Sequence, residues 1–259
     1  MSQQSILVEQ RGAVALLTLN RPDSANVLNL AMGRQLLDSV IAIEANPAVR
    51  AVVITGAGKH FCFGGDLRGM MAEGGAVDAY LRALTSLLHS AISHLVRMDA
   101  PVIAAVNGTA AGGGIGFVTS ADLCICGSSS KFSLAYTGVA LTPDCSSSFF
   151  LPRLIGHRRA MELILTNRML GAEEALSWGL VNQVVPDAEV LAEALKLADK
   201  LAAGPRSAYG KSKQLLAGST GALESHLALE SQMISRQAVS VEGQEGIRAF
   251  LDKRKPSFG

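Results

Sequence analysis

The sequence predicts an α/β fold in which a unit of buried strand, glycine turn and helix repeats, followed by a helical C-terminal region. Two stretches, 52–65 and 102–113, carry the repeat, because each starts on a run of Val, Ile and Ala and ends on consecutive glycines. A unit that recurs in this way is typical of a stacked or spiral architecture. From residue 188 onward the apolar spacing is almost wholly helical. We therefore expect a core over residues 1–190 and a helical region over 191–259.

The N-terminal part predicts a hairpin and a helix. Residues 5–10 and 13–19 are two strand-like runs joined by an Arg-Gly turn, which is a hairpin signal. Asn29 can cap a helix over residues 30–45, where apolar side chains recur at helical spacing. The chain is therefore expected to open with two paired strands and one amphipathic helix.

Strands and helices alternate along the rest of the core. Leu81, Leu84 and Leu88 begin an apolar stripe at helical spacing that continues to about Met98. Short buried strands are expected at 51–55, 102–106, 123–126 and 181–185. Helices of the C-terminal region are expected at 188–203, 207–217, 222–239 and 242–251.

Composition and charge exclude several classes of protein. About half of the residues are hydrophobic (49%) and only 17% are charged, which excludes a disordered chain. Lys plus Arg (23) nearly cancels Asp plus Glu (22), so the basic face that nucleic acid requires is not expected. Charge this sparse favours burial of some apolar surface between subunits.

The sequence carries no clear targeting, membrane or metal signal. The first ten residues lack a charged segment followed by an apolar stretch, and no apolar run approaches the roughly 18 residues of a membrane span. The four cysteines show neither CxxC spacing nor partnered histidines, so no disulfide framework or zinc site is expected. We expect a cytoplasmic protein with no membrane, metal or nucleic-acid partner.

The two glycine loops do not match the common nucleotide-binding or nucleophile motifs. Residues 56–60 lack the spacing of a phosphate-binding loop, and Phe117 stands where a dinucleotide fingerprint would have its last glycine. No G-x-S-x-G nucleophile elbow occurs in the sequence. One backbone N–H from each loop could instead stabilise negative charge on a single carbonyl oxygen. A helix whose first turn is 115–118 would add its dipole to the stabilisation of that oxygen. The alternative is that both loops are only tight turns.

Several short motifs fall in order over nearly the whole chain. They are Asn20-Arg21-Pro22 with Asn26 and Leu28, residues 55–67, residues 101–108 with Gly112-Gly113-Gly114, Trp178-Gly179-Leu180-Val181, and residues 249–254. Together they resemble the crotonase (enoyl-CoA hydratase/isomerase) superfamily. The resemblance implies a spiral of strand–strand–helix units with a helical C-terminal trimerisation region, and hence a homotrimer or a hexamer. It also implies an acyl-CoA thioester substrate and no separate cofactor, since coenzyme A arrives as part of the substrate.

The resemblance also assigns residues to the site. The N–H groups of Gly65 and Gly113 would form an oxyanion hole for the thioester carbonyl. Phe250 and Lys253 would reach the CoA bound to a neighbouring subunit. The other residues that would contact the CoA or the acyl group are Ala25, Phe63, Asp66, Leu67 and Tyr136.

The chain departs from the hydratase pattern at two positions. Hydratases of this family carry two glutamates that hold and activate water, and these would lie at Gly116 and Tyr136. A different carboxylate, Asp144, lies in a Pro-Asp-Cys run that resembles the 1,2-epoxyphenylacetyl-CoA isomerase and 3-enoyl-CoA isomerase branches. Isomerisation needs one base that takes a proton from one carbon and returns it to another, so a single carboxylate is enough. We therefore expect an acyl-CoA isomerase with Asp144 as its base, and a hydratase as one alternative.

Two further alternatives stay open. Residues 156–168 also resemble 4-chlorobenzoyl-CoA dehalogenases, in which Asp144 would be a nucleophile and His89 would activate water. That branch has a tryptophan where this chain has Tyr136, and His89 lies beside the apolar stripe of its helix, which favours a packing role. Cys145 is likewise expected to pack, because no histidine lies near it in the sequence. The alternative outside enzymes is a member that binds acyl-CoA without converting it.

Overall fold

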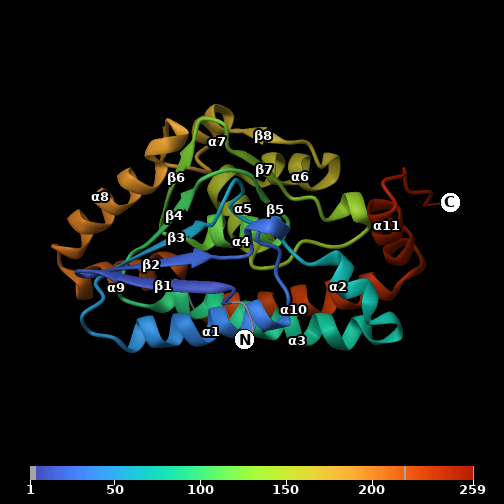
Figure 1. Cartoon of the computed structure of the whole chain (residues 1–259), viewed down its shortest axis with the longest axis horizontal. Helices are drawn as coiled ribbons and strands as arrows, with labels where there is room; N and C mark the ends of the chain where they lie inside the picture. Colours follow the sequence, from blue (N-terminus) through green and yellow to red (C-terminus); the bar gives the residue numbers. More distant parts are fainter. Residues whose placement is uncertain (1–3, 219, 259) are drawn as a thin grey trace.

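The centre of the molecule is a six-stranded sheet in the order β1-β2-β3-β4-β6-β9 (Figure 1). The computed structural model describes residues 4–218 and 220–258, so residues 1–3, 219 and 259 of the expected core and helical region lie outside it. The two N-terminal strands form the expected hairpin, and all other neighbours in this sheet are parallel. The strands are β1 (Ile6–Arg11), β2 (Val14–Leu19), β3 (Ala51–Gly56), β4 (Val102–Val106), β6 (Leu123–Gly127) and β9 (Gln183–Val185). The predicted fold class is confirmed.

Helices cover both faces of this sheet (Figure 1). On one face, α8 (Val190–Ala202) packs against alternate residues of the parallel strands, such as Val53 and Ile103. The buried residues of α8 are spaced four apart and are mostly alanines, so the helix can approach the sheet closely. They are Val190, Ala194, Ala198 and Ala202. The other face carries the larger core and the helices α1 (Leu30–Ala45), α3 (Val77–Arg97) and α10 (Thr220–Val239).

The helices after residue 190 pack on the core of the same chain. α10 lies along α3, and α11 (Val241–Leu251) contacts the short helix α2 (Leu67–Ala72). α9 (Arg206–Ala217) contacts the other end of α3. The ends of these helices lie within two residues of the expected ends. Their role in forming a trimer stays a prediction.

Short elements around the site were not expected from the sequence. A second sheet joins β5 (Ala110–Ala111), β7 (Lys131–Ser133) and β8 (Leu170–Gly171); strands this short show no apolar period. Pro152 lies inside one of the unexpected helices, where a sequence reading places a break. The remaining helices are α4 (Gly113–Ser120), α5 (Ser147–Ile155), α6 (His157–Thr166), α7 (Ala172–Trp178) and the 3₁₀ turns η1 (Pro22–Ser24), η2 (Gly74–Ala76), η3 (Thr137–Val139) and η4 (Asp187–Glu189). Of these, only α4 was expected; the helix is confirmed, but it begins at Gly113, two residues before the expected first turn at 115–118.

The last strand is shorter than expected. The prediction at 181–185 was wrong at its first two residues, because the N–H groups of Leu180 and Val181 bind the carbonyl of Ala175 and close the end of α7. Pairing with β6 starts only at Gln183. Among the described helices, none is both long and apolar enough to cross a membrane.

Candidate active site

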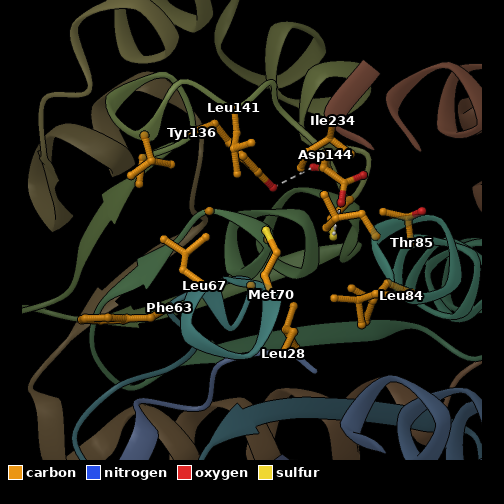
Figure 2. Close-up of a pocket in the computed structure, with 18 of the residues that line it drawn as sticks. Leu28, Phe63, Leu67, Met70, Leu84, Thr85, Tyr136, Leu141, Asp144 and Ile234 are labelled. Carbon is orange, nitrogen blue, oxygen red and sulfur yellow. Dashed lines mark hydrogen bonds between the residues drawn. The ribbon is translucent and has the colours of Figure 1, made fainter. Parts of the chain in front are cut away.

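A small cavity lies where the helical layer meets the two glycine loops (Figure 2). Its volume is about 110 Å³, and we call it the inner cavity. Among the described residues that line it, Asp144 supplies the one carboxyl group. Most of the wall is apolar: Leu28, Phe63, Leu67, Met70, Leu81, Leu84, Leu88, Val139, Leu141, Ile234 and Phe250. The site therefore offers a carboxylate in surroundings suited to a compact apolar group.

The two glycine loops meet at this cavity. A β-bridge joins Leu28 to Gly65, and a Cβ on Gly64 would lie 2.7 Å from the amide nitrogen of Gly113. Gly113 is the first residue of α4, so its N–H has no acceptor within the helix. Among the hydrogen bonds of the described residues, neither the N–H of Gly65 nor that of Gly113 has a protein acceptor. Both groups can therefore donate to an oxygen atom bound in the cavity.

Asn26 holds the first glycine loop in place. Its side chain is fully buried, and its amide nitrogen donates to the carbonyls of Ala57, His60 and Phe61 at 3.0, 2.8 and 3.1 Å. Its Oδ1 accepts the N–H of Arg21 at 2.8 Å. Asn26 therefore fixes the first glycine loop relative to the Asn-Arg-Pro motif. The sequence alone did not assign this contact to Asn26.

Asp144 is held through its backbone. Its carbonyl accepts hydrogen bonds from the Ser147 hydroxyl at 2.6 Å and from the Tyr136 hydroxyl at 3.2 Å. Burial is the main cause that raises the pKa of Tyr136, and the nearby side chains of Cys145 and Asp144 raise it further. The Tyr136 hydroxyl therefore acts here as a neutral donor. Tyr136 thus lines the inner cavity, as expected, and also fixes Asp144 (Figure 2).

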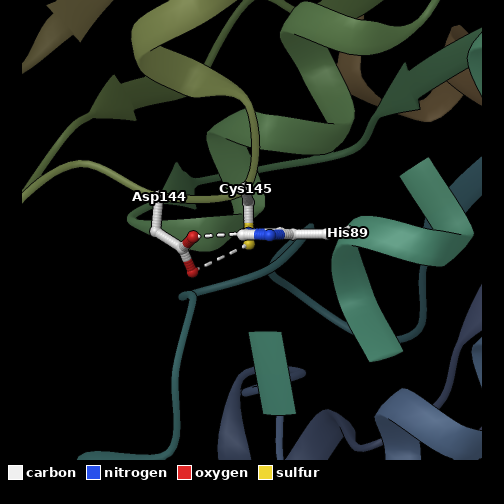
Figure 3. Close-up of side chains that lie close together, drawn as sticks. All are labelled: His89, Asp144 and Cys145. Atoms are coloured by element: carbon white, nitrogen blue, oxygen red, sulfur yellow. Dashed lines mark hydrogen bonds and ion pairs between the residues drawn. The ribbon is translucent and has the colours of Figure 1, made fainter. Parts of the chain in front are cut away.

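His89 binds the side chain of Asp144 (Figure 3). The Nε2 atom of His89 lies 2.6 Å from Oδ1 of Asp144, and both side chains are buried. Burial by itself lowers the pKa of His89, but the Asp144 carboxylate and its hydrogen bond more than offset this, so that pKa lies above its usual value. A packing histidine was expected; the structure shows that His89 is buried and bonded to Asp144, which the sequence could not show because a helical stripe does not reveal which loop will face it.

The His89–Asp144 bond requires a shared proton. Nε2 of His89 and Oδ1 of Asp144 lie 2.6 Å apart, and because an ionised carboxylate can only accept, a proton must lie between these two atoms. The two side chains therefore form one unit that holds and releases a proton.

Cys145 is a neutral buried thiol beside this pair. Its Sγ lies 3.5 Å from Oδ2 of Asp144, and burial, reinforced by the Asp144 charge, raises its pKa. The ligand atoms of His89, Asp144 and Cys145 lie within 4.8 Å of one another. Two ligands of a tetrahedral zinc ion would be about 3.3 Å apart, so the 2.6 Å bond between His89 and Asp144 is a hydrogen bond rather than a metal site.

Gly116 has no room for a side chain. A Cβ at this position would lie 2.2 Å from the carbonyl oxygen of Cys145. Helix α4 packs directly against the turn that carries Asp144, which fills the space that a glutamate would need. The packing of α4 against this turn therefore requires glycine at position 116, where the hydratase pattern has a glutamate.

A second, outer cavity of about 370 Å³ adjoins the inner one. The two cavities share Phe63, Gly65, Leu67 and Phe250, and Ala25 and Asp66 line the outer cavity with Arg68. Asp66 also caps α2 through the N–H of Gly69 at 3.1 Å and lies 3.4 Å from Arg21. The expected contact residues Ala25, Phe63, Asp66 and Leu67 are thus brought together.

The contact of Phe250 and Lys253 with the CoA of a neighbouring subunit stays a prediction. Within the chain, Phe250 lines both cavities, and α11 contacts α2. Lys253 lines neither cavity and is exposed.

Sequence reasoning missed one charged residue of the site. Glu230 on α10 is only 4% exposed, and its carboxylate accepts the N–H of Ser146, two residues after Asp144, at 2.7 Å. Burial, followed by the charge of Asp144, raises its pKa to about 7. A lone glutamate in a helical pattern carries no sign that it will be buried, so the sequence offered no signal for it.

Comparison with known proteins identifies the family. The enoyl-CoA hydratase/isomerase family model matches residues 9–259. The chain is 38% identical to a probable enoyl-CoA hydratase of Rhodobacter capsulatus, over 100% of this chain and 99% of the relative. It is 37% identical to 1,2-epoxyphenylacetyl-CoA isomerase of Escherichia coli (98% and 97% covered). It is 36% identical to 4-chlorobenzoyl coenzyme A dehalogenase-2 of Arthrobacter (99% and 94% covered).

Solved structures agree with this match. The crystal structure of an enoyl-CoA hydratase/isomerase from Pseudoalteromonas atlantica superposes with a TM-score of 0.86 at 33% identity, covering 98% of this chain and 100% of the other. The match extends over the sheet, the glycine loops and the C-terminal helices. The chain therefore belongs to the enoyl-CoA hydratase/isomerase family of acyl-CoA enzymes.

Proposed function

We propose that this protein is an acyl-CoA isomerase in which Asp144 is the base. The observation that carries the proposal is the placement of Asp144: it is the one carboxyl group lining the inner cavity among the described residues, and the cavity is also lined by Gly65 and Gly113. A thioester carbonyl bound by those two N–H groups would lie next to a base that can reach the acyl carbons.

The reaction would move one proton. Asp144 takes a proton from a carbon of the acyl group, and the negative charge that develops on the thioester oxygen is stabilised by the N–H groups of Gly65 and Gly113. The abstracted proton stays on Oδ2 of Asp144, while Oδ1 remains hydrogen-bonded to Nε2 of His89. The same proton then returns to a different carbon, which shifts the double bond without net consumption of water.

Water addition is less well supported by the residues. It uses an acid and a base on the two sides of the double bond, but position 116 has no space for a carboxylate side chain and position 136 is Tyr136. Relatives named as hydratases and as isomerases are similar to this chain to nearly the same degree, so the residues of the site, rather than overall identity, favour isomerisation.

The size of the inner cavity favours a compact acyl group. A cavity of about 150 Å³ is enough to hold a benzene ring, and the inner cavity measures about 110 Å³ before any side chain adjusts. We therefore propose a short aliphatic or single-ring acyl group, with the CoA portion in the outer cavity. Arg68, which lines the outer cavity, is placed to attract the phosphate groups.

One observation favours a second candidate, an aryl-CoA dehalogenase or hydrolase. In that reaction Asp144 attacks the substrate as a nucleophile, and His89 activates the water that releases the resulting ester. The 2.6 Å contact between the two side chains supports this candidate, because the histidine lies next to the carboxylate on which the ester would form. Two Arthrobacter relatives at 36% identity carry the name 4-chlorobenzoyl coenzyme A dehalogenase.

One experiment separates the candidates. The protein is incubated with aliphatic and aryl CoA thioesters, including 3-enoyl-CoA and a chloroaryl-CoA, in heavy water and separately in H₂¹⁸O, and products are analysed by mass spectrometry. An isomerase exchanges substrate protons for deuterium and incorporates no ¹⁸O, whereas an aspartate nucleophile places ¹⁸O on its own carboxylate and releases chloride. Net water addition to a 2-enoyl-CoA, or tight binding with no conversion of any thioester, would overturn the isomerase proposal.

A further inference from the structure

The turn that follows Asp144 has an uncommon backbone. Cys145 and Ser146 both have positive φ angles, 56° and 63°, in a region that residues other than glycine rarely adopt. Helix α5 starts directly afterwards at Ser147, and the side chain of Ser146 does not cap it. Besides the Ser147 hydroxyl, which binds the Asp144 carbonyl, contacts from outside the turn can therefore hold this backbone in place.

Glu230 supplies this support from the C-terminal helix α10. Its Oε2 accepts the N–H of Ser146 at 2.7 Å, and its Oε1 accepts both the N–H of Ser148 at 3.2 Å and the Ser148 hydroxyl. The side chain of Glu230 is 4% exposed, so water does not compete for these bonds. A carboxylate suits this place, because the N–H groups at a helix start carry partial positive charge.

Glu230 is also coupled to the charge of the site. Burial, followed by the negative charge of Asp144, raises its pKa to about 7, and His89 acts in the opposite direction. On its own helix, the Nε2 of His226 lies 3.5 Å from Oε1 of Glu230 and 2.7 Å from the Ser148 hydroxyl. The remaining titratable groups around this cluster are Tyr136 and Cys145, both neutral, and Arg153, which together with burial lowers the pKa of His226.

We propose that Glu230 is a positioning residue for Asp144, which holds the turn at residues 145–148 and so fixes the Asp144 carboxylate between His89 and the inner cavity. The inference rests on the proposed role of Asp144 in catalysis, whichever of the two reactions it performs. The glycine loops and the outer cavity, which would bind the thioester and the CoA, do not contact Glu230. Its loss should therefore affect turnover far more than substrate binding.

The test compares Glu230→Gln with a matched control on the same helix. Glu224→Gln changes a carboxyl group that binds Arg97 and Ser93 near the surface, away from the turn. In Glu230→Gln the amide nitrogen cannot accept an N–H, so one of the two backbone bonds is lost. We expect kcat to fall by about 10- to 100-fold while KM changes by less than about threefold, and Glu224→Gln to match the wild type.

A second measurement does not depend on turnover. The titration midpoint of the His89 imidazole is followed by NMR on histidine-labelled protein. An ionised Glu230 favours the protonated state of the His89–Asp144 pair, so its removal should lower the His89 midpoint by about half a pH unit or more. A purely structural role would change stability but not this midpoint.

These outcomes separate the two proposals. If the wild type converts no thioester, the proposed function fails, but a lowered His89 midpoint in Glu230→Gln still supports the positioning role. An unchanged midpoint in the folded variant overturns the positioning role, whatever the activity. If Glu230→Gln does not fold, Ser148→Ala removes one donor to Glu230, makes it harder to ionise, and should move the His89 midpoint in the same direction. An unchanged midpoint in Ser148→Ala then overturns the inference.

Discussion

Nε2 of His89 and Oδ1 of Asp144 lie 2.6 Å apart, although 55 positions separate the two residues in the sequence. Helix α3 supplies the histidine and the loop before α5 supplies the aspartate, so the packing of α3 against the core decides the chemistry of the carboxylate. Through this hydrogen bond His89 makes Asp144 part of a two-residue acid–base unit rather than an isolated base.

Asp144→Asn should abolish turnover and keep binding. The amide is the same size but cannot take a proton, so we expect proton exchange at the acyl carbons to fall by about a thousandfold, with acyl-CoA affinity close to that of the wild type. Exchange is measured by mass spectrometry in heavy water, and affinity by calorimetry with a substrate analogue. Wild-type exchange in the folded variant would move the catalytic role to another residue, with Tyr136 the next candidate.

His89→Gln distinguishes the two proposed reactions. A purely packing role for His89 would make this change nearly silent in an isomerase, but the bond to Asp144 changes that expectation. Without His89 the Asp144 carboxyl group loses the hydrogen bond that orients Oδ1, so it is placed less well against the acyl carbons. We expect kcat to fall about tenfold. In the hydrolase reaction the same variant would instead accumulate a covalent ester on Asp144, visible by intact-protein mass spectrometry.

The N–H of Gly113 can be tested with a matched pair of variants. Gly113→Pro removes the N–H at the first position of α4, where proline is tolerated, and we expect turnover to fall about a hundredfold or more. Gly113→Ala keeps the N–H and adds a Cβ that lies 3.2 Å from both Cys145 Sγ and Leu28 Cδ1, so it measures the effect of crowding alone. Equal losses in both variants, or wild-type turnover in folded Gly113→Pro, would remove this amide from the mechanism.

The sequence predicted the large elements because their signals are local. The buried strands β3 and β4 are uninterrupted apolar runs, and the stripes of α3 and α8 keep helical spacing. Gly65, Gly113 and Asp144 could be singled out as candidates because each lies in a short motif, and all three line the inner cavity. What the sequence could not provide is the meeting of distant segments: His89 with Asp144, Glu230 with Ser146, and Phe250 with its own chain's cavity.

The contact between Gly116 and Cys145 predicts that hydratase activity cannot be restored by a single change. A Cβ at residue 116 would lie 2.2 Å from the Cys145 carbonyl oxygen, and either this turn or α4 must move to accept it. We expect Gly116→Ala to lower the free energy of unfolding by about 2 kcal/mol and to reduce turnover by displacing Asp144. Gly116→Glu should add no hydratase activity; hydration of crotonyl-CoA by this variant, followed by absorbance, would contradict the packing argument.

Exposed apolar side chains on α9 favour association of subunits. Leu215 and Leu216 are 82% and 90% exposed in the single chain, which is unusual for a surface that faces only water. We expect a homotrimer or a dimer of trimers at micromolar concentration, and Leu216→Glu to weaken it. Sedimentation velocity measures the change, with Lys211→Glu on the same helix as the control for added negative charge. A wild-type monomer would contradict the prediction directly. A chain truncated at Pro186 would also lose the helices expected to form the subunit contacts. It is a less specific test than Leu216→Glu, because it also removes Glu230 and Phe250.

The pKa of Glu230 predicts how stability depends on pH. The folded protein raises this pKa from 4.5 to about 7, so between these values the folded state binds more protons than the unfolded state. The resulting stability is fully present below about pH 4.5 and is lost as the pH rises through 7, a loss of about 3 kcal/mol. The raised pKa of His89 acts in the same direction at higher pH, whereas the lowered pKa values of His60 and His226 oppose it.

Comparison with Glu230→Gln isolates the contribution of this one group. The free energy of unfolding is measured in urea from about pH 5 to pH 8 for the wild type and the variant, with Glu224→Gln as the control. Glutamine does not titrate, so the stability of the wild type relative to Glu230→Gln should fall as the pH rises, with half of the total change reached midway between 4.5 and about 7. The control should follow the wild type. Parallel curves for the wild type and Glu230→Gln would show that Glu230 has an ordinary pKa and is not coupled to Asp144.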